Sequence, residues 1–303
     1  MTSKTHYSNG KLLLTGEYVV LDGALSLAVP TSFGQSMEVK PLDEPKVIWR
    51  SLDYKNNLWF KTEIKIKNLH SGLNQFTDGY TLRLFEILQA VNQLNPEILN
   101  SGHLVETKLT FPQDWGLGSS STLINNIANW AKVDPYKLLE LTFGGSGYDI
   151  ACAQFNKPIT YQLGNNIKRT VKEVDFNPSF KDALYFVHLN KKQNSREGIA
   201  HYKANKTNKT EEIKEVSNIT TEIISCTNLS DFQELINNHE QLVSKIIQQI
   251  PVKVKLFPDF IGAVKSLGAW GGDFILVTSE DNPERYFKQK GYTTILPYSE
   301  MIK

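Results

Sequence analysis

The stretch that decides the fold is Trp115–Thr122, Trp-Gly-Leu-Gly-Ser-Ser-Ser-Thr, a glycine turn that runs directly into an apolar-periodic segment. The period of the following apolar residues predicts a helix whose first turn carries only hydroxyl side chains. The first N–H groups of a helix have no partner within it, and the helix dipole places partial positive charge there. Gly116 and Gly118 lack a Cβ, so an anion can approach the backbone closely. Serine hydroxyls can bind a phosphate or reach Mg²⁺. The stretch therefore predicts a site for the phosphate chain of a nucleotide.

This loop differs from the two best-known phosphate-binding loops. It lacks the Lys-Ser/Thr ending of a P-loop and the Gly-x-Gly-x-x-Gly spacing of a dinucleotide fold. From these residues alone, a serine-capped helix behind a tight turn, with no ligand, is an equally good interpretation.

Composition limits the class of protein. The chain has 303 residues, of which 40% are hydrophobic and 21% charged, as in a globular protein of one large or two smaller domains. The net charge of +1 gives no electrostatic reason to expect nucleic acid or an anionic membrane as partner. No apolar run approaches the ~20 residues that span a bilayer, and the N-terminus lacks the apolar core of a signal peptide. The two cysteines, Cys152 and Cys226, are expected to be free thiols in a reducing cytoplasm.

The order of the expected elements indicates a mixed α and β fold. Over the first ~75 residues, short runs broken by Gly, Pro, Asp and Asn predict strands. These are Lys11–Leu14, Ser26–Val29, Ser36–Val39, Val47–Arg50, Leu58–Thr62 and Glu63–Ile66. Later strands are expected at Val105–Phe111, Ile159–Leu163, Ala183–Leu189 and Phe274–Thr278. Helices are expected at Asp78–Leu94, from Asp134 onward, and at Lys209–Cys226, Asp231–Ile250 and Pro258–Lys265.

Three further glycine-containing stretches accompany the serine loop in a fixed order. The four stretches are Gly10–Leu21, Pro112–Ser121, Gly144–Ala151 and Lys265–Phe274. Their identity and order resemble the GHMP kinases, the superfamily of galactokinase, homoserine kinase, mevalonate kinase and phosphomevalonate kinase. The string Gly-Tyr-Asp-Ile-Ala at Gly147–Ala151 resembles a bacterial branch close to the mevalonate and phosphomevalonate kinases.

The resemblance covers essentially the whole chain and implies an α+β fold of two domains. Residues 1–168 would form an N-terminal ATP-binding domain of mixed α/β structure with a left-handed βαβ-type nucleotide site. Residues 169–303 would form a C-terminal α+β sandwich domain. The resemblance also implies ATP and Mg²⁺, a small anionic substrate, no nucleic acid and no membrane, and it leaves a homodimer open.

Two residues are the candidates for catalysis. Phosphoryl transfer needs cations on the transferring group and a group that handles the proton of the acceptor. Lys11 can supply the positive charge, and its alternative is a solvated lysine at the start of a strand. Asp149 matches the Asp of the family's Ser-Gly-x-Asp motif, which implies a general base. Its alternative is the N-cap of a helix.

The resemblance assigns the nucleotide phosphates to the residues of the serine loop, which are Trp115, Gly116, Leu117, Gly118, Ser119, Ser120 and Ser121. Ser120 is the first choice for a hydroxyl on Mg²⁺, and Ser121 the second. The family often adds a glutamate upstream of the catalytic aspartate, for which Glu140 is the nearest candidate. Its spacing is shorter than usual, so a surface glutamate on an amphipathic helix is an equal alternative.

Substrate contacts are expected from three places in the chain. The basic run Lys191–Glu197 resembles the substrate-side loop of the phosphomevalonate branch, and in it Lys192, Ser195 and Arg196 could hold a carboxylate or phosphate. Its alternative is a solvated turn. The remaining candidates are Glu17, Tyr18, Gly268 and Ala269, and for Glu17 and Tyr18 a packing role is equally expected.

The C-terminal stretch departs from the family pattern Gly-Ala-Gly-x-Gly-Gly, because Trp270 and Asp273 replace two glycines. An aspartate near phosphates would be repulsive unless it faces a metal, a lysine or backbone donors. The leading interpretation is an ATP-dependent kinase, with mevalonate as the first acceptor and phosphomevalonate as the second. A nucleotide-binding protein of this fold that has lost turnover or serves regulation is the alternative from another class.

Overall fold

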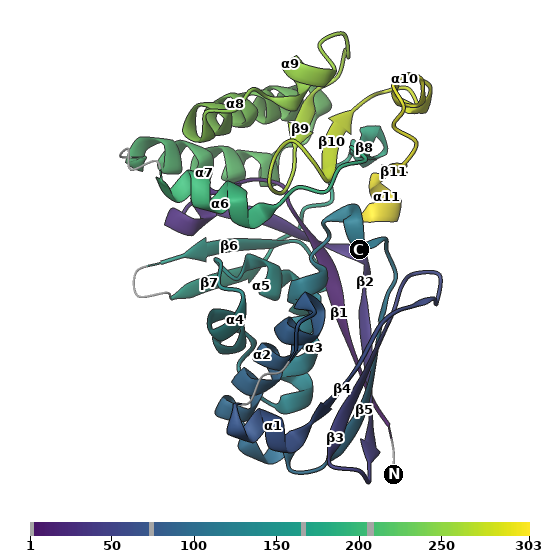
Figure 1. Cartoon of the computed structure of the whole chain (residues 1–303). Coiled ribbons are helices and arrows are strands. Elements are labelled where there is room, and N and C mark those ends of the chain that lie inside the picture. Colours follow the sequence, from purple (N-terminus) through teal and green to yellow (C-terminus); the bar gives the residue numbers. More distant parts are fainter. Residues whose placement is uncertain (1–2, 73–75, 165–167, 205–208) are drawn as a thin grey trace. The chain divides into compact units, whose positions relative to one another are not determined.

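A computed structural model describes residues 3–72, 76–164, 168–204 and 209–303 (Figure 1). The chain forms two compact units. The N-terminal unit comprises Met1–Gly10, Phe33–Gln113 and Leu117–Gln154, and the C-terminal unit comprises Lys11–Ser32, Asp114–Gly116 and Phe155–Lys303. This division differs from the expected one at residue 168, because the segments 11–32 and 114–116 pack with the C-terminal unit and the chain crosses over at residue 155.

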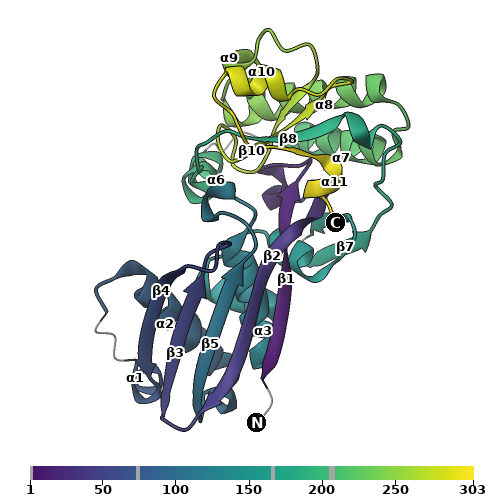
Figure 2. The same cartoon turned by 90° about the vertical axis from the view of Figure 1, so that its right-hand side faces the viewer.

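The N-terminal unit is a sheet with helices on one face (Figures 1 and 2). Its strands follow the order β4-β3-β5-β2, and β1 pairs with β2. β3 and β5 are parallel, whereas β3 with β4 and β2 with β5 are antiparallel. The strands are β1 (Lys4–Leu13), β2 (Ser26–Leu42), β3 (Lys46–Leu52), β4 (Leu58–Lys65) and β5 (Gly102–Leu109). The helices are α1 (Ile66–Ser71), α2 (Gly79–Leu94), α3 (Ser119–Ala131), α4 (Pro135–Thr142) and α5 (Tyr148–Gln154).

In this unit the expected helix starts are confirmed, whereas some runs expected as separate strands form one longer strand. The Asp78 side chain accepts from Thr81 N–H at the start of α2, and the Asp134 side chain accepts from Tyr136 N–H before Pro135 of α4. The runs expected at 26–29 and 36–39 belong to the single long strand β2, and those at 58–62 and 63–66 to β4, except that Ile66 begins α1. One core fills the space between sheet and helices, with Trp49, Phe85 and Ile127 among its buried side chains.

The C-terminal unit has a second sheet, of order β11-β8-β10-β9, whose neighbouring strands are all antiparallel. The β6–β7 hairpin instead pairs with the first residues of β2, where Ser26 lies opposite Tyr161. The strands are β6 (Ile159–Leu163), β7 (Arg169–Glu173), β8 (Leu184–His188), β9 (Val264–Ser266), β10 (Phe274–Thr278) and β11 (Ile295–Pro297). The helices are α6 (Ser195–Ala204), α7 (Thr210–Ser225), α8 (Leu229–Ile247), α9 (Val252–Leu256), α10 (Glu284–Gln289) and α11 (Tyr298–Met301).

One expected helix is wrong. Residues 258–265 form turns that lead into β9, because the chain here runs against β10 rather than coiling. A Cβ on Gly262 would lie 1.7 Å from the Thr278 carbonyl oxygen, so only glycine lets the two backbones come this close. The expected amphipathic pair α7 and α8 is confirmed, with Ile223 and Val243 buried.

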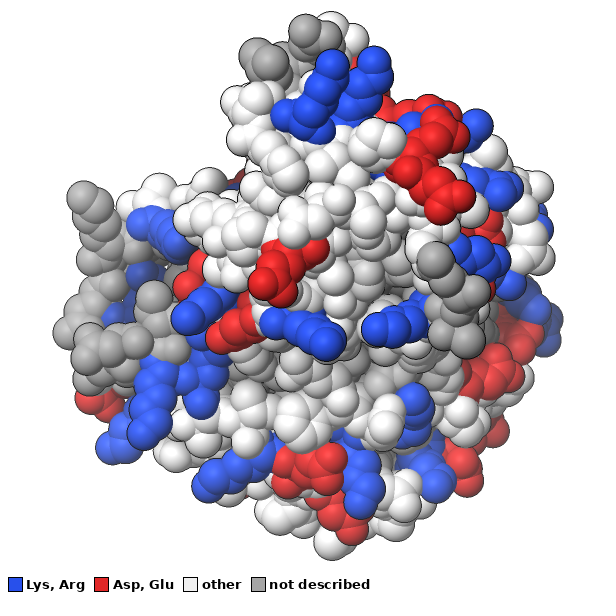
Figure 3. Space-filling view, turned by 90° about the horizontal axis from the view of Figure 1, so that it is seen from below, with Lys and Arg blue, Asp and Glu red and all other residues white. Residues whose placement is uncertain are grey.

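Surface charges of both signs are interspersed on the face drawn in Figure 3 rather than gathered into one field. This agrees with the net charge of +1. Among the described residues, no helix combines the length and the apolar character needed to cross a membrane.

Candidate active site

The serine loop opens α3 without a side-chain cap. Gly118 occupies the N-cap position at a left-handed φ of 87°, and no side chain bonds the first N–H groups. The Ser121 hydroxyl donates to the Gly118 carbonyl at 2.8 Å, so it holds the turn itself. Ser120 is exposed, and its hydroxyl has no hydrogen-bond partner among the described residues. Of the two serines expected at Mg²⁺, Ser120 is the one whose hydroxyl is available to a ligand.

Asp149 lies on α5, which packs beside α3 in the same unit. The Gln154 amide donates to the Asn125 side chain at 3.1 Å and ties the two helices together. The Asp149 carboxylate is half-buried and accepts from Ile150 N–H at 3.1 Å. The Gly147 carbonyl accepts the first helical bond, from Ala151 N–H, so Asp149 sits in the first turn and not at the N-cap. The geometry therefore does not support the N-cap alternative.

Glu140 is exposed on α4, while its neighbours Leu138 and Leu139 face the core. This position fits the alternative of a surface glutamate on an amphipathic helix. Within the described ranges, no cluster of three or more His, Cys, Asp or Glu side chains could hold a metal. Mg²⁺ is usually held by one or two protein groups together with substrate phosphates, for which the Ser120 hydroxyl at a helix N-terminus is suitable.

In the C-terminal unit, Lys11 and Asp273 meet at Gly116, and we call Lys11, Gly116, Gln193 and Asp273 the Lys11 cluster. The Lys11 ammonium donates to the Gly116 carbonyl at 2.9 Å. The Asp273 carboxylate lies against Gly116 and accepts from Gln193 N–H at 3.2 Å. Burial raises the pKa of the Asp273 carboxyl, and the positive charge of Lys11 offsets part of that rise. Asp273 thus faces a lysine and a backbone donor, two of the partners that an aspartate in this position requires.

The basic loop and the C-terminal glycine stretch are held together in the same unit. Asp273 N–H donates to the Lys191 carbonyl at 2.7 Å, and Leu189 N–H donates to the Asp273 carbonyl at 2.8 Å. Lys192 and Arg196 are exposed, and the charge of Lys192 also lowers the pKa of Asp273. The Ser195 side chain lies outside what the structure describes. This unit therefore brings Lys11, the basic loop and the glycine stretch together.

Tyr18 connects the first glycine stretch to the last one. Its hydroxyl donates to the Ala269 carbonyl at 2.8 Å, and its side chain is buried. Gly198 of α6 packs against the same ring, since a Cβ there would lie 2.4 Å from the Tyr18 hydroxyl oxygen. Gly268 precedes Ala269 at a φ of 60°. The contacts of Tyr18 are those of packing, the alternative left open by the sequence.

Glu17 belongs to a buried charged group that the sequence did not predict, and we call Glu17, His239, Glu240 and Lys265 the buried charge cluster. The Lys265 ammonium lies 2.6 Å from a Glu17 oxygen and 3.2 Å from a Glu240 oxygen. His239 Nε2 accepts from Gly16 N–H at 3.0 Å. Burial raises the pKa of Glu17 to about 7. The signal in the sequence was weak: His239 and Glu240 fall on the apolar stripe of α8, between Ile236 and Val243.

Two members of the serine loop are held by packing. The Trp115 ring meets Phe274 edge to face, with centroids 5.3 Å apart, and Leu117 is fully buried. These contacts hold the turn on either side of Gly116, whose own backbone is covered by Asp273.

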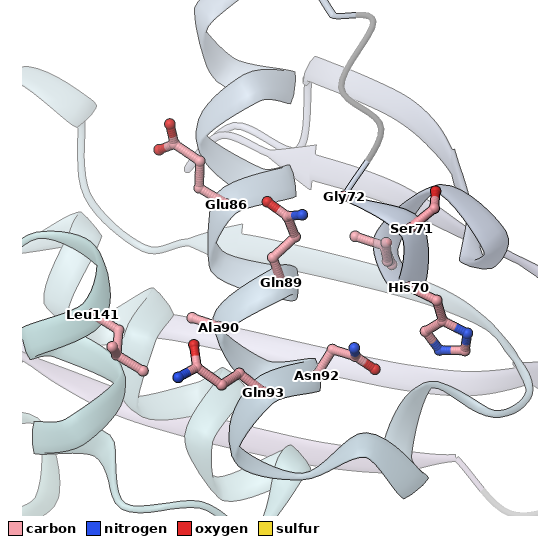
Figure 4. Close-up of a pocket in the computed structure, with 10 residues that line it drawn as sticks. His70, Ser71, Gly72, Glu86, Gln89, Ala90, Asn92, Gln93 and Leu141 are labelled. Carbon is pink, nitrogen blue, oxygen red and sulfur yellow. The ribbon is translucent and has the colours of Figure 1, made fainter.

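The N-terminal unit also holds an open cavity of about 550 Å³ between α1, α2 and α4 (Figure 4). His70, Gln89, Asn92 and Gln93 give it a polar lining, and Leu141 closes one side. It shares no residue with the sites expected from the sequence.

Comparisons with known proteins identify the fold. No family model matches the chain, and no curated protein sequence matches it. The mevalonate kinase of Methanococcus jannaschii is 17% identical over 97% of both chains, with a TM-score of 0.70. A phosphomevalonate kinase of Streptococcus pneumoniae, solved with phosphomevalonate and AMPPNP, is 15% identical over 95% of both chains, with a TM-score of 0.69. The galactokinase of Lactococcus lactis, solved with galactose, is 13% identical over 99% of this chain and 93% of that one, with a TM-score of 0.68. The chain has the α+β fold of the GHMP kinases, as the resemblance predicts.

We expect Gly116→Ala to destabilise the protein more than Gly144→Ala. Both glycines have nearly the same left-handed φ, 68° and 67°, but a Cβ on Gly116 would lie 2.4 Å from Asp273 Cγ, whereas Gly144 has nothing within 4 Å. The backbone strain costs about 1–2 kcal/mol in either variant, and overpacking adds a further ~1–3 kcal/mol at Gly116 alone. Unfolding in urea gives the free energy of unfolding of both variants.

Replacing Asp273 by glycine should remove the extra loss at Gly116, because the clashing carboxylate is then absent. The two alanine variants should become nearly equal in that background. Equal losses in the wild-type background would contradict the close contact.

We expect Glu17→Gln to change how stability depends on pH. Burial raises the pKa of Glu17 from 4.5 to about 7, so the folded chain keeps a proton that the unfolded chain releases between these values. The contribution of this carboxyl to stability is therefore complete at low pH and is lost as the pH rises through 7. The free energy of unfolding of the wild type minus that of Glu17→Gln should fall between pH 4.5 and about pH 7 and level off above. Glu234→Gln, an exposed change on α8, is the control, and a pH-independent difference for Glu17→Gln would count against a buried, titrating Glu17.

Proposed function

We propose that this protein is an ATP-dependent, Mg²⁺-requiring kinase of the GHMP superfamily that acts in the cytoplasm. The observation that carries the proposal is the Lys11 cluster, where the Lys11 ammonium donates to Gly116 of the serine loop. Ser119 and Ser120 follow Gly116 by three and four residues in the chain and begin α3. A lysine and a helix N-terminus with an available hydroxyl are suited to a triphosphate chain.

The acceptor that we propose is a small anionic alcohol or phosphate, with mevalonate first and phosphomevalonate as the alternative. Lys191 and Lys192, on an exposed loop, and Arg196, in the first turn of α6, gather positive charge where the loop enters the helix. A carboxylate or phosphate is the natural partner of such a loop. Proteins of similar fold include mevalonate kinases and a phosphomevalonate kinase, but a fold alone does not determine a substrate.

In this proposal, with an alcohol as acceptor, Asp149 takes the proton of the hydroxyl while its oxygen bonds to the γ-phosphorus, the bond from that phosphorus to the β–γ bridging oxygen breaks, and ADP leaves. Lys11 stabilises the negative charge on the transferring group. Mg²⁺, when bound with ATP, neutralises the phosphates, and the Ser120 hydroxyl would hold it on the protein side, with Glu140 as the less suited second group. Lys192, Ser195 and Arg196 hold the acceptor. The backbone of Gly268 and Ala269 borders it.

A second candidate is a nucleotide-binding protein that has lost turnover or serves regulation. Trp270 and Asp273 favour it, because they stand where the family pattern has glycine. The presence of Lys11, Ser120 and Asp149 favours the kinase.

The two candidates separate in one experiment. We expect ADP release from MgATP with mevalonate or phosphomevalonate, and little with galactose, because a neutral sugar has no charge for the basic loop. MgATP should also raise the melting temperature by ligand linkage, and less so in Ser120→Ala. Stabilisation by MgATP without ADP release from any acceptor favours the second candidate. Faster turnover of galactose overturns the anionic acceptor.

The basic loop is tested by Arg196→Ala beside Lys203→Ala, an exposed change on the same helix. The first should raise the KM of the acceptor more than that of ATP, and the second should leave both unchanged. If the two variants had equal effects, the charge of Arg196 would not contact the acceptor, and the basic loop would be a solvated turn.

We expect Asp149→Asn to lower kcat by ~100- to 10,000-fold, the range of a general base, because the amide keeps the shape but cannot take the proton. The melting temperature and the affinity for MgATP should stay near those of the wild type. Single-turnover kinetics and thermal melting measure the two effects. If the variant keeps most of its activity, Asp149 is not the general base, and Lys11 would have to promote phosphoryl transfer without it.

A further inference from the structure

In the described part of the chain, the outer edge of β4 has backbone groups with no strand to pair with. β4 is the end strand of the sheet in the N-terminal unit, and in the described part of the chain β3 is its one strand neighbour (Figure 2). The N–H and C=O groups that face away from β3 form a template on which another strand can add. The strand has eight residues, long enough for several such bonds.

Large apolar side chains are exposed along the same edge. Leu58, Trp59 and Tyr80 are 48%, 39% and 64% exposed. The Trp59 ring meets Tyr80 edge-on with centroids 5.3 Å apart, and Phe60 packs on Tyr80 at 5.9 Å. These side chains place apolar surface beside the outer edge of β4, where an added strand would cover part of it.

The charged residues of β4 alternate on the opposite face from the core. Trp59, Lys61, Glu63 and Lys65 are exposed, whereas Ile64 is buried and Thr62 is half-buried. Glu63 already pairs with Lys46 of β3 at 3.2 Å. Successive side chains of a strand point to opposite faces, so these four lie in one row along the edge.

We propose that β4 pairs antiparallel with β4 of a second copy of this chain, around a two-fold axis at Thr62. In this register Lys61 lies opposite the partner's Glu63, and Trp59 lies opposite the partner's Lys65. Each of these contacts occurs twice. The sheet then continues from one copy into the other.

Neighbouring registers are disfavoured by the same charges. An axis at Lys61 places two lysines opposite each other, and an axis at Glu63 places two glutamates opposite each other. Residues directly opposite each other point to the same face of a sheet. A register that places an odd-numbered residue opposite an even-numbered one would therefore put the buried Ile64 on the same face as the partner's exposed row. The row is thus complementary to itself, which is the property of a two-fold interface and selects a second copy over an unrelated strand.

The expected strength is modest. Opposite charges and aromatic contacts across strands contribute ~0.2–1 kcal/mol each, and a lysine over a tryptophan ring adds about as much. Dimerisation should therefore depend on concentration, and sedimentation equilibrium over about 1–500 µM protein is expected to show a monomer–dimer equilibrium.

Charge reversal tests the register. Lys61→Glu and Glu63→Lys each place like charges opposite one another, and each should weaken dimerisation by at least about tenfold. The double variant restores opposite charges and should recover dimerisation. Lys137→Glu, the same change of charge on the exposed side of α4, should have no effect.

The outcomes separate the alternatives. A monomer at every concentration overturns the proposal. A dimer that persists in both single variants, or is not recovered in the double variant, places the interface elsewhere. Circular dichroism of each variant shows that the fold is kept, since the changed side chains are on the surface.

Discussion

The buried contact of the Lys265 ammonium with Glu17 is the interaction on which the C-terminal unit depends. It joins residues 248 apart in the chain, and Glu240 of α8 shares the same ammonium. Removing charges from water is costly, and leaving one of them unpaired costs about 3–5 kcal/mol. The pair therefore requires the first glycine stretch, β9 and α8 to be in place at the same time. Tyr18, next to Glu17, then reaches Ala269 of the altered glycine stretch.

The altered glycine stretch keeps the backbone of a glycine loop although two of its residues are not glycine. Trp270 and Asp273 have φ values of 56° and 53°, in the left-handed region that glycine enters without strain. The surroundings hold Asp273 in this conformation through its own N–H bond to Lys191 and the Gln193 N–H bond to its carboxylate. Both residues therefore take a conformation that glycine enters without strain, and Asp273 adds one carboxylate beside Lys11.

Local signals were sufficient for the elements of the N-terminal unit but not for the division of the chain. Asp78 and Asp134 mark helix starts because an N-cap acts on residues two or three positions away. The helix after the serine loop was predicted from another local signal, the period of its apolar residues. The pairing of β6 with Ser26–Ala28, and the packing of residues 11–32 with the C-terminal unit, depend on partners far along the chain. The burial of Lys265 could not be predicted from its neighbours in the sequence, because the carboxylates that pair with it, Glu17 and Glu240, lie far away in the chain.

The charges around Lys11 explain where an anionic acceptor would have to be recognised. Asp273 opposes Lys11 within the same cluster, so the lysine has little charge left over for a second anion beside the phosphates of ATP. The surplus lies on the basic loop, where Lys191, Lys192 and Arg196 face one carboxylate, Glu197, which the Asn194 amide already engages. In the proposed kinase, the choice of acceptor is therefore expected to follow the basic loop, while Lys11 serves the phosphoryl group that is transferred.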